Sequence, residues 1–212
     1  MTDNPTPKRR RPSQVRSRQL TDALVEATRD CIETIGLYEM TTNHIAKRAG
    51  TSIGSLYQYF SNKEELVNAV FQEFFGKASE VVVDKVSKLI EEDLETSFRE
   101  TMAATLDYFE DQAVLMIELS RDWYNPRTAD AIRTFERQGA DLLRLYFMKH
   151  HNEYHIEDLQ TVAYVLFNSV VFTIARYIGE KQKTVDRDAF IDQLTRLVTS
   201  YVQGFLVLPD AK

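Results

Sequence analysis

Apolar residues recur every three or four positions along most of the chain, and this spacing predicts α-helices throughout. A first helix covers residues 20–35 and ends at Gly36. No alternating strand pattern and no glycine-rich nucleotide loop interrupts the helical periodicity, so the sequence predicts an all-α protein. Further periodic stretches cover residues 63–90, 94–110, 112–123 and 127–149.

The last two predicted helices are unusually apolar. Residues 162–178 are apolar on nearly every side, as expected for a helix that is buried all round or spans a membrane. Asn168, Thr173 and Arg176 interrupt this stretch, which leaves no apolar run of about 18 residues. We therefore expect this helix to be buried on one side against its own domain and on the other against a second copy of the chain. The final helix, residues 190–205, carries its apolar side chains on one stripe. A monomer with an ordinary buried helical hairpin is the alternative.

Residues 41–63 predict two very short helices joined by a tight turn. Thr42 is the expected N-cap of the first helix, since its hydroxyl can accept from a free backbone N–H. Gly50 fits the left-handed position at the end of that helix. Ser52 is the expected N-cap of the second helix, which we expect to run to about Phe60. Two short helices around such a turn are typical of a helix-turn-helix.

The second short helix divides into an inner and an outer face. Leu56 and Phe60 are four residues apart, so both should face the core. Ser55, Gln58 and Tyr59 are then left outside, where a solvent-facing helix can enter the major groove of DNA. A third helix begins at residue 63, after a cap at residue 61 or 62.

The run Gly-x-Leu-Tyr-x-Tyr-Phe-x-x-Lys-Glu-x-Leu, from Gly54 to Leu66, resembles the DNA-binding signature of the TetR (tetracycline repressor) family of bacterial regulators. The resemblance covers roughly the first third of the chain, and the remainder is similar only in length and helical character. It implies an N-terminal three-helix helix-turn-helix domain followed by a C-terminal helical domain for ligand binding and dimerisation.

Length and charge agree with a two-part organisation. The chain has 212 residues and a net charge of −6, with basic residues in excess near the start and acidic residues in excess afterwards. A basic head suits a protein whose head meets a polyanion. We expect a basic disordered arm at 1–16, the helix-turn-helix domain at 17–62 and the helical domain at 63–212. The arm is expected to contact the minor groove or the phosphates, and a solvated tail is the alternative.

The resemblance implies a set of DNA contacts, residue by residue. Ser55 and Gln58 are expected to reach base edges, and a glutamine pairs well with adenine. Ser52 and Ile53 complete the group on which sequence specificity should depend. Phosphate contacts set the register without reading sequence. The full set of expected contacts to a double-stranded DNA operator is Thr42, Thr51, Ser52, Ile53, Gly54, Ser55, Tyr57, Gln58, Tyr59 and Lys63.

The resemblance also implies an effector pocket among the helices between the DNA-binding head and the dimer interface. Aromatic and methionine side chains with a few polar groups suit a medium-sized, largely apolar small molecule. The alternative for each residue is an ordinary core position. Asn168 needs a polar partner in its apolar helix, which a ligand or the dimer mate can supply. The expected lining is Phe98, Met102, Leu106, Met116, Leu119, Trp123, Tyr124, Phe135, Tyr146, Asn168 and Phe172.

The expected mechanism has two states. The long helix from Lys63 should meet the recognition helix at one end and the pocket at the other. A ligand that favours one tilt of this helix would change the separation of two recognition helices, which must lie about 34–36 Å apart on a palindrome. Gly76 allows this helix to bend, or else permits a close helix contact.

Some features of the sequence suit other classes of function. We expect no enzyme activity, cofactor or metal; a metal cluster at His150, His151 and His155 is the enzyme alternative, and it lacks a cysteine or second ligand pair. Another alternative is a helix-turn-helix protein without a small-molecule inducer, acting through a protein partner or as an activator. The single cysteine, Cys31, excludes an internal disulfide. The polar, basic start predicts no signal peptide, so we expect a cytoplasmic protein.

Overall fold

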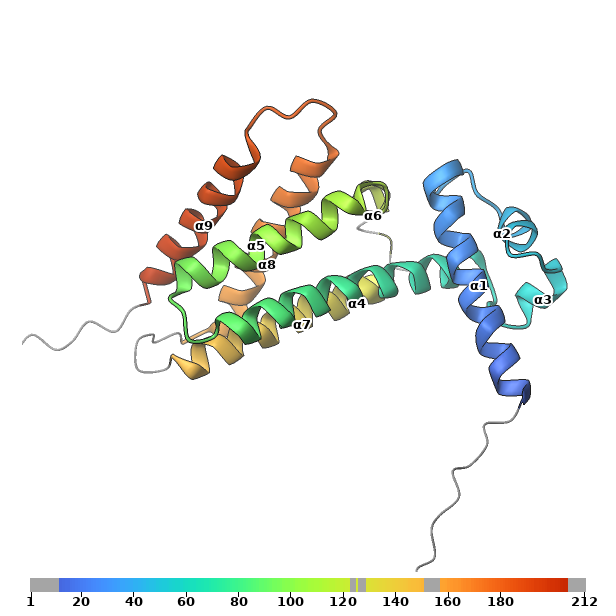
Figure 1. Ribbon diagram of the computed structural model, residues 1–212, viewed down its shortest axis with the longest axis horizontal. Helices are drawn as coiled ribbons and strands as arrows, with labels where there is room; N and C mark the ends of the chain where they lie inside the picture. The colour runs from blue at the N-terminus through green and yellow to red at the C-terminus, as the bar shows by residue number, and fades with distance from the viewer. Residues whose placement is uncertain (1–11, 123–124, 126–128, 151–156, 206–212) are drawn as a thin grey trace, which may run out of the picture. The chain divides into compact units, whose positions relative to one another are not determined.

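The computed structural model describes residues 12–122, 125, 129–150 and 157–205, and Figure 1 shows their arrangement. These residues are helical wherever they have regular structure, which confirms the all-α prediction. The helices are α1 (Pro12–Ile35), α2 (Thr42–Arg48), α3 (Ile53–Tyr57), α4 (Lys63–Leu89), α5 (Leu94–Asp111), α6 (Ala113–Asp122), α7 (Ala129–Lys149), α8 (Leu159–Gly179) and α9 (Arg187–Gln203).

The chain divides into two compact units, Met1–Val70 and Phe71–Lys212. The division falls inside α4, whereas the sequence analysis placed a boundary at the start of that helix. The difference follows from burial, because Leu66 and Val70 in the first turns of α4 are fully buried and belong to the first unit. Helix α4 thus contributes its beginning to one unit and its remainder to the other.

The first unit holds α1, α2, α3 and the start of α4 around an apolar core. Leu24, Ile45 and Leu56 are completely buried in it, one from each of the first three helices. Helix α1 begins at Pro12, a residue that suits a first helical position because its missing N–H has no helical partner there. The helix ends before Gly36, as the sequence predicted. Gly36 has a φ of 95°, in the left-handed region.

The N-terminal end of α4 is held by reciprocal side-chain caps. The backbone N–H of Glu65 donates to Asn62 Oδ1 at 2.8 Å, so Asn62 is the cap of this helix. The Glu65 carboxylate in turn accepts from the backbone N–H of Ser61 at 2.7 Å. Both bonds satisfy N–H groups that have no partner inside the helix.

Aromatic rings from four helices form the centre of the second unit. Phe74 on α4 stacks on Phe109 of α5, with ring centroids 5.5 Å apart. Phe75, also on α4, stacks on Phe135 of α7 at 4.6 Å, and Phe135 meets Phe167 of α8 edge-on at 5.1 Å. Such pairs stabilise packing by about 0.5–1.5 kcal/mol beyond the area that they bury.

Two polar contacts attach α4 to its neighbours in this unit. The Tyr108 hydroxyl on α5 donates to the backbone carbonyl of Phe74 at 2.9 Å. The Ser79 hydroxyl donates to Gln138 Oε1 on α7 at 2.5 Å. These bonds fix the axial position of α4 against α5 and α7, because each one joins a single atom of α4 to a single partner.

Helix α9 packs mainly on α5, and charged pairs bind the two together. Arg187, at the start of α9, donates to Glu110 at 3.0 Å and also pairs with Asp107. Arg99 meets Asp192 at 2.9 Å. In Figure 1 α8 and α9 follow one another as an antiparallel pair, and α5 lies alongside α9.

Two helical glycines of the second unit differ in their surroundings. A Cβ on Gly139 of α7 would lie 2.8 Å from Cδ2 of Phe167, so the glycine permits this ring to rest against the α7 backbone. No atom lies within 4 Å of a Cβ built on Gly76 of α4. The close-contact explanation of Gly76 is therefore wrong, because no neighbouring helix approaches its Cα.

The two glycines give a matched stability test. We expect Gly139→Ala to lower the free energy of unfolding by about 1–2 kcal/mol, because displacing Phe167 costs more than the alanine gains in helix propensity. We expect Gly76→Ala to raise it by about 0.5–1 kcal/mol. Urea unfolding followed by circular dichroism measures both, and equal effects of the two substitutions would contradict the packing described here.

Candidate functional site

Helix α2 opens the candidate DNA-binding surface with a capping box. The Thr41 hydroxyl accepts from the backbone N–H of His44, and His44 Nδ1 accepts from the backbone N–H of Thr41, both at 3.3 Å. The N-cap is therefore Thr41, and the prediction of Thr42 was wrong by one residue, because the helix begins one residue earlier than expected. Thr42 instead places its hydroxyl 3.2 Å from the Tyr57 hydroxyl on α3.

The turn between α2 and α3 has the predicted geometry. Gly50 has a φ of 65°, a conformation that glycine adopts without a Cβ clash. The backbone N–H of Thr51 donates to the carbonyl of Ala46 at 3.0 Å, and that of Gly50 to the carbonyl of Lys47 at 3.2 Å. This pair of bonds is the Schellman arrangement that closes a helix C-terminus, and it fixes the angle at which α3 leaves.

Helix α3 is a five-residue helix with a serine cap. Ser52 accepts from the backbone N–H of Ser55 at 3.0 Å, and the two hydroxyls lie 2.9 Å apart, which confirms Ser52 as the N-cap. The helix ends at Tyr57 with Gln58 as its C-cap, so the expectation that it runs to Phe60 was wrong. The backbone N–H groups of residues 58–60 turn back onto the carbonyls of Ser55 and Leu56, which ends the helix.

The side chains around α3 are presented to solvent. Leu56 is fully buried and anchors the helix, whereas Ile53 is 37% and Tyr57 52% exposed. Tyr59 is exposed as well, although it lies beyond the end of the helix. The sequence-predicted positions therefore gather on one exposed part of the first unit: Ser52, Ile53, Gly54, Tyr57, Gln58 and Tyr59 are exposed, and Thr42, Thr51, Ser55 and Lys63 are half-buried.

Lys63 has internal partners that the sequence did not predict. Its ammonium group donates to the backbone carbonyls of Leu37 and Met40, at 3.2 and 3.3 Å. The side chain thereby joins the start of α4 to the segment between α1 and α2. An ammonium group has three donors, and these two bonds use two of them.

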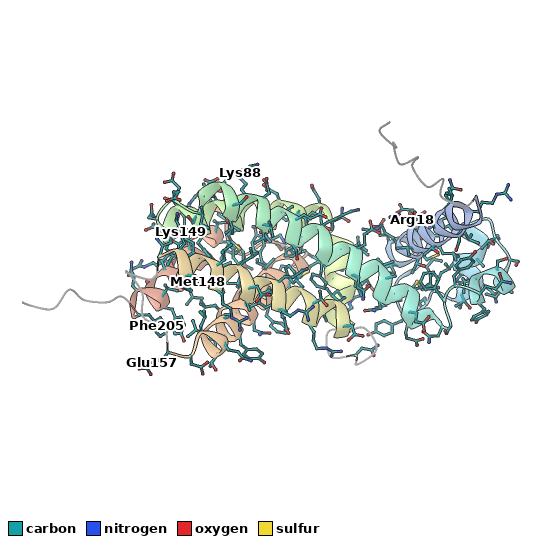
Figure 2. All side chains as sticks on the ribbon, turned by 90° about the horizontal axis from the view of Figure 1, so that it is seen from below. Arg18, Lys88, Met148, Lys149, Glu157 and Phe205 are labelled. Atoms are coloured by element: carbon teal, nitrogen blue, oxygen red, sulfur yellow. The ribbon has the colours of Figure 1, made fainter. Side chains whose placement is uncertain are left out.

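Basic side chains near this surface divide into two groups. Arg48 on α2 donates to Thr34 Oγ1 at 2.9 Å and lies 3.9 Å from Asp30, so it is engaged with α1. Arg16 and Arg18 are exposed on the first turns of α1, and Figure 2 shows Arg18 projecting from that helix. The remaining basic residues of the expected arm, at positions 8–11, lie outside the described residues.

The single cysteine is a core residue. Cys31 is fully buried in the first unit, and burial raises the pKa of its thiol. A thiol that stays protonated packs as a small apolar group and is a poor nucleophile.

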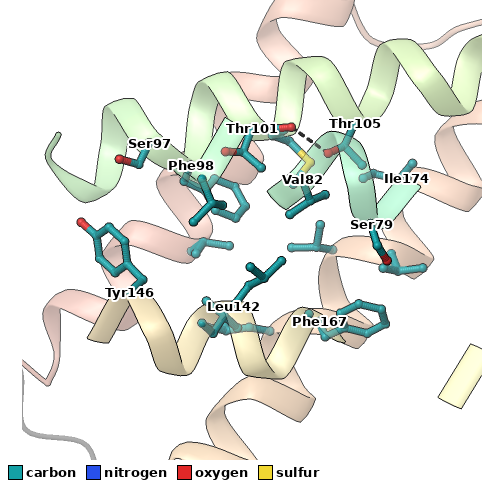
Figure 3. Close-up of a pocket in the computed structure, with 18 of the residues that line it drawn as sticks. Ser79, Val82, Ser97, Phe98, Thr101, Thr105, Leu142, Tyr146, Phe167 and Ile174 are labelled. Carbon is teal, nitrogen blue, oxygen red and sulfur yellow. Dashed lines mark hydrogen bonds between the residues drawn. The ribbon is translucent and has the colours of Figure 1, made fainter. Parts of the chain in front are cut away.

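The second unit contains an apolar cavity of about 170 Å³, partly open to solvent. Figure 3 shows side chains from α4, α5, α7 and α8 converging on it, with Phe98 above Leu142 and Tyr146 at one end. Nothing that lines it among the described residues is charged. The lining residues are Ser79, Val82, Val86, Leu94, Ser97, Phe98, Thr101, Met102, Thr105, Phe109, Phe135, Gly139, Leu142, Leu143, Tyr146, Leu166, Phe167, Val170, Val171, Ile174 and Val198.

The cavity includes only part of the predicted lining. Four of the predicted residues line it: Phe98, Met102, Phe135 and Tyr146. Three others are fully buried elsewhere in the unit: Leu106, Met116 and Leu119. Trp123 and Tyr124 lie outside the described residues, as do His151 and His155 of the metal alternative. The sequence analysis missed the small polar residues of the lining, although Ser97, Thr101 and Thr105 follow helical spacing with Phe98.

Asn168 and Phe172 lie on the opposite side of α8 from the cavity, because the helix turns Phe167 and Val171 inward. The Asn168 amide donates to the carbonyl of Tyr164 at 2.9 Å, and so finds its polar partner within the helix. Arg176 likewise pairs with Glu180 at 3.3 Å.

Helices α8 and α9 both carry large apolar side chains that are exposed. Tyr164 is 65% exposed on α8, and Leu197 is 53% exposed on α9. Helix α8 is long and apolar enough to cross a membrane by length and composition alone, and half of its apolar window is buried inside the fold. We call the exposed apolar residues of the two helices the α8/α9 face: Tyr164, Val165, Phe172, Leu197 and Tyr201.

Comparison with known families assigns the chain to a class. A family profile described as "Bacterial regulatory proteins, tetR family" matches residues 24–70, and one described as "Tetracyclin repressor-like, C-terminal domain" matches residues 93–201. The second match alone spans more than half of the chain. The protein therefore belongs to the TetR family, whose members are DNA-binding transcriptional regulators with a helix-turn-helix.

The individual relatives share limited sequence identity with this chain. The HTH-type transcriptional regulator BetI from Klebsiella pneumoniae is 33% identical over 75 residues, which are 35% of this chain and 36% of BetI. The match thus spans about a third of these curated relatives. A TetR-family regulator structure from Syntrophomonas wolfei has a TM-score of 0.71 at 17% identity, covering 91% of this chain and 100% of that one. FadR from Bacillus subtilis, in complex with stearoyl-CoA, has a TM-score of 0.63 at 19% identity, covering 87% and 98%.

Lys63 provides a test of the DNA-binding unit that needs no DNA. We expect Lys63→Met to lower the free energy of unfolding by about 1–2 kcal/mol, because two half-buried carbonyls lose a charged donor. Lys77→Met is the control, since Lys77 makes only an exposed pair with Glu73 and should change stability by less than about 0.5 kcal/mol. Urea unfolding measures both variants. An unfolding midpoint for Lys63→Met that matches the control would show that its two hydrogen bonds do not stabilise the fold.

Proposed function

We propose that this chain is a ligand-responsive repressor of a nearby operon. A homodimer binds a palindromic DNA operator, and a small, largely apolar molecule in the cavity releases it. The observation that carries this proposal is the single helix α4, which begins at the capped end in the helix-turn-helix unit and lines the cavity with Ser79, Val82 and Val86.

The recognition surface supports the DNA part of the proposal. Ser52, Ile53, Ser55 and Gln58 surround a short helix of a size that enters the major groove, and Gln58 is suited to adenine N6 and N7. The paired hydroxyls of Thr42 and Tyr57 are close enough to donate to one phosphate. Thr51, Gly54, Tyr59 and the third donor of Lys63 complete the phosphate contacts in this proposal.

The α8/α9 face supports the homodimer. Exposed aromatic and aliphatic side chains on two neighbouring helices favour association, and a two-fold dimer is the commonest symmetric assembly. A two-fold dimer presents two recognition helices to two operator half-sites, which a palindrome supplies. A DNA-binding regulator of this kind acts in the cytoplasm.

The cavity favours regulation by a small-molecule effector over regulation by a protein partner alone. A sealed core would favour a regulator without a small ligand, whereas this unit contains an apolar space partly open to solvent. FadR from Bacillus subtilis, a structural neighbour, was crystallised in complex with stearoyl-CoA, a molecule that combines a long apolar acyl chain with a charged coenzyme A group. An effector that fits one position of α4 better than another would change the spacing of the recognition helices. Coupling of this kind is about 1–3 kcal/mol in general.

Two substitutions test the DNA contacts. Genome-wide footprinting of the tagged protein identifies operator sites, and fluorescence anisotropy then measures affinity at several salt concentrations. We expect Gln58→Ala to weaken operator binding by about 1–3 kcal/mol with little change on random DNA, because a base contact is lost. We expect Tyr57→Phe to weaken binding to both, because a phosphate contact carries no sequence code. Wild-type affinity in both variants would count against the proposed surface.

A charge placed on the α8/α9 face tests the dimer. We expect Leu197→Asp to convert the protein from dimer to monomer, because a buried unpaired carboxylate opposes association. The control is Val83→Asp on α4, at a site that is 47% exposed compared with 53% for Leu197. Sedimentation velocity gives the mass of each variant. A dimeric Leu197→Asp, or a wild type that is monomeric at all concentrations, would contradict the proposal.

A further inference from the structure

The polar side chains that line the cavity all carry hydroxyl groups, and three of these hydroxyls donate to partners inside the protein. Ser79 donates to Gln138 at 2.5 Å, and Ser97 donates to the carbonyl of Leu89 at 2.8 Å. Thr105 donates to the carbonyl of Thr101 at 2.7 Å, the bond that Figure 3 draws as a dashed line. These three hydroxyls already donate within the protein, so they do not require a hydrogen-bond partner from a ligand.

Thr101 differs from Ser79, Ser97 and Thr105. The residue is 8% exposed, and its Oγ1 is buried with no hydrogen-bond partner among the residues that the structure describes. Figure 3 shows its side chain on the side of α5 that faces α7 and the cavity. A buried hydroxyl without a partner is unfavourable, so a partner that arrives with a ligand is favoured.

The other buried threonines in the described helices each make a hydrogen bond to the backbone that Thr101 lacks. Each one donates to the backbone carbonyl four residues earlier, which is the usual way for a threonine inside a helix to satisfy its hydroxyl. Thr101 does not donate to the carbonyl of Ser97. The threonines with this bond are Thr28, Thr105, Thr195 and Thr199, at 2.7 to 2.9 Å.

The surroundings of Thr101 bear on the charge of a ligand and on the size of the part that the cavity encloses. None of the described lining residues is charged, so an ion that enters loses its hydration without gaining a counter-charge. The volume of about 170 Å³ is close to that of an apolar cavity of about 150 Å³ that holds benzene in another protein. A compact molecule with one ring or a short chain fits this space.

We propose that the cavity binds an uncharged, compact, mainly apolar molecule whose single oxygen or nitrogen is hydrogen-bonded by the Thr101 hydroxyl. This inference rests on the proposed function of the cavity as the effector site, and it names the chemistry of the effector. A hydroxyl both donates and accepts, so alcohols, ketones, esters and amides all satisfy it. A carboxylate does not fit because it is charged. A pure hydrocarbon does not fit because it has no atom that can hydrogen-bond to the Thr101 hydroxyl.

Three probes of one shape test the proposal by isothermal titration calorimetry on the full chain without DNA. They are 3-phenylpropan-1-ol, 3-phenylpropanoate and propylbenzene. We expect the alcohol to bind about three- to tenfold more tightly than propylbenzene, which is the usual range for one neutral hydrogen bond, and more tightly than the carboxylate. A carboxylate that binds as well as the alcohol, or binding of none of the three, would overturn the proposal.

Matched variants locate the hydrogen bond. Thr101→Val should abolish the advantage of the alcohol over propylbenzene, whereas Thr105→Val should keep it, because the Thr105 hydroxyl already has a partner. Thr101→Ser should also keep it. Without any ligand, Thr101→Val should raise Tm by roughly 2–4 °C, because an unsatisfied hydroxyl is removed, and Thr105→Val should not. An alcohol preference that survives in Thr101→Val, or a Tm lowered equally by both valines, would overturn the assignment.

DNA release is measured separately, so that the two proposals can fail independently. An alcohol that binds through Thr101 and leaves operator affinity unchanged supports this inference and contradicts the proposed release mechanism. Release by 3-phenylpropanoate alone, unaffected by Thr101→Val, supports the release mechanism and overturns this inference.

Discussion

Helix α4 is continuous through both units of the protein, and both units are built around it. Its first turns complete the core of the helix-turn-helix unit, with Leu66 and Val70 fully buried. Its later turns supply a wall of the cavity and two of the central aromatic rings. Residues Lys63–Leu89 form one continuous helix, so a single element carries residues of both units.

The second unit contains both a cluster of aromatic rings and an apolar cavity. Phe74 stacks on Phe109, and Phe75 stacks on Phe135. Beside them the helices leave an apolar space, and its lining loses the dispersion contacts that a filled core would have. An occupant restores those contacts, which gives a physical reason why binding there changes the packing of the helices around it.

The sequence predicted the parts of the molecule that depend on local chemistry. Ser52 as a cap, Gly50 as a left-handed turn residue and Leu56 as an anchor each follow from a residue and its immediate neighbours, and the structure confirms them. The cavity lining was predicted less well because it depends on how distant helices are rotated. Phe172 is of a residue type that is common in pockets, and yet it faces outward. Thr101 is of a type that is common on surfaces, and yet it is buried and lines the cavity.

The central claim is that occupancy of the cavity and binding of the operator are coupled through α4. The most direct test measures the operator affinity of the wild-type protein with and without a saturating cavity ligand, and the ligand affinity with and without the operator. We expect each partner to weaken binding of the other by the same factor, about 5- to 150-fold. Operator affinity that is unchanged when the cavity is full would contradict it.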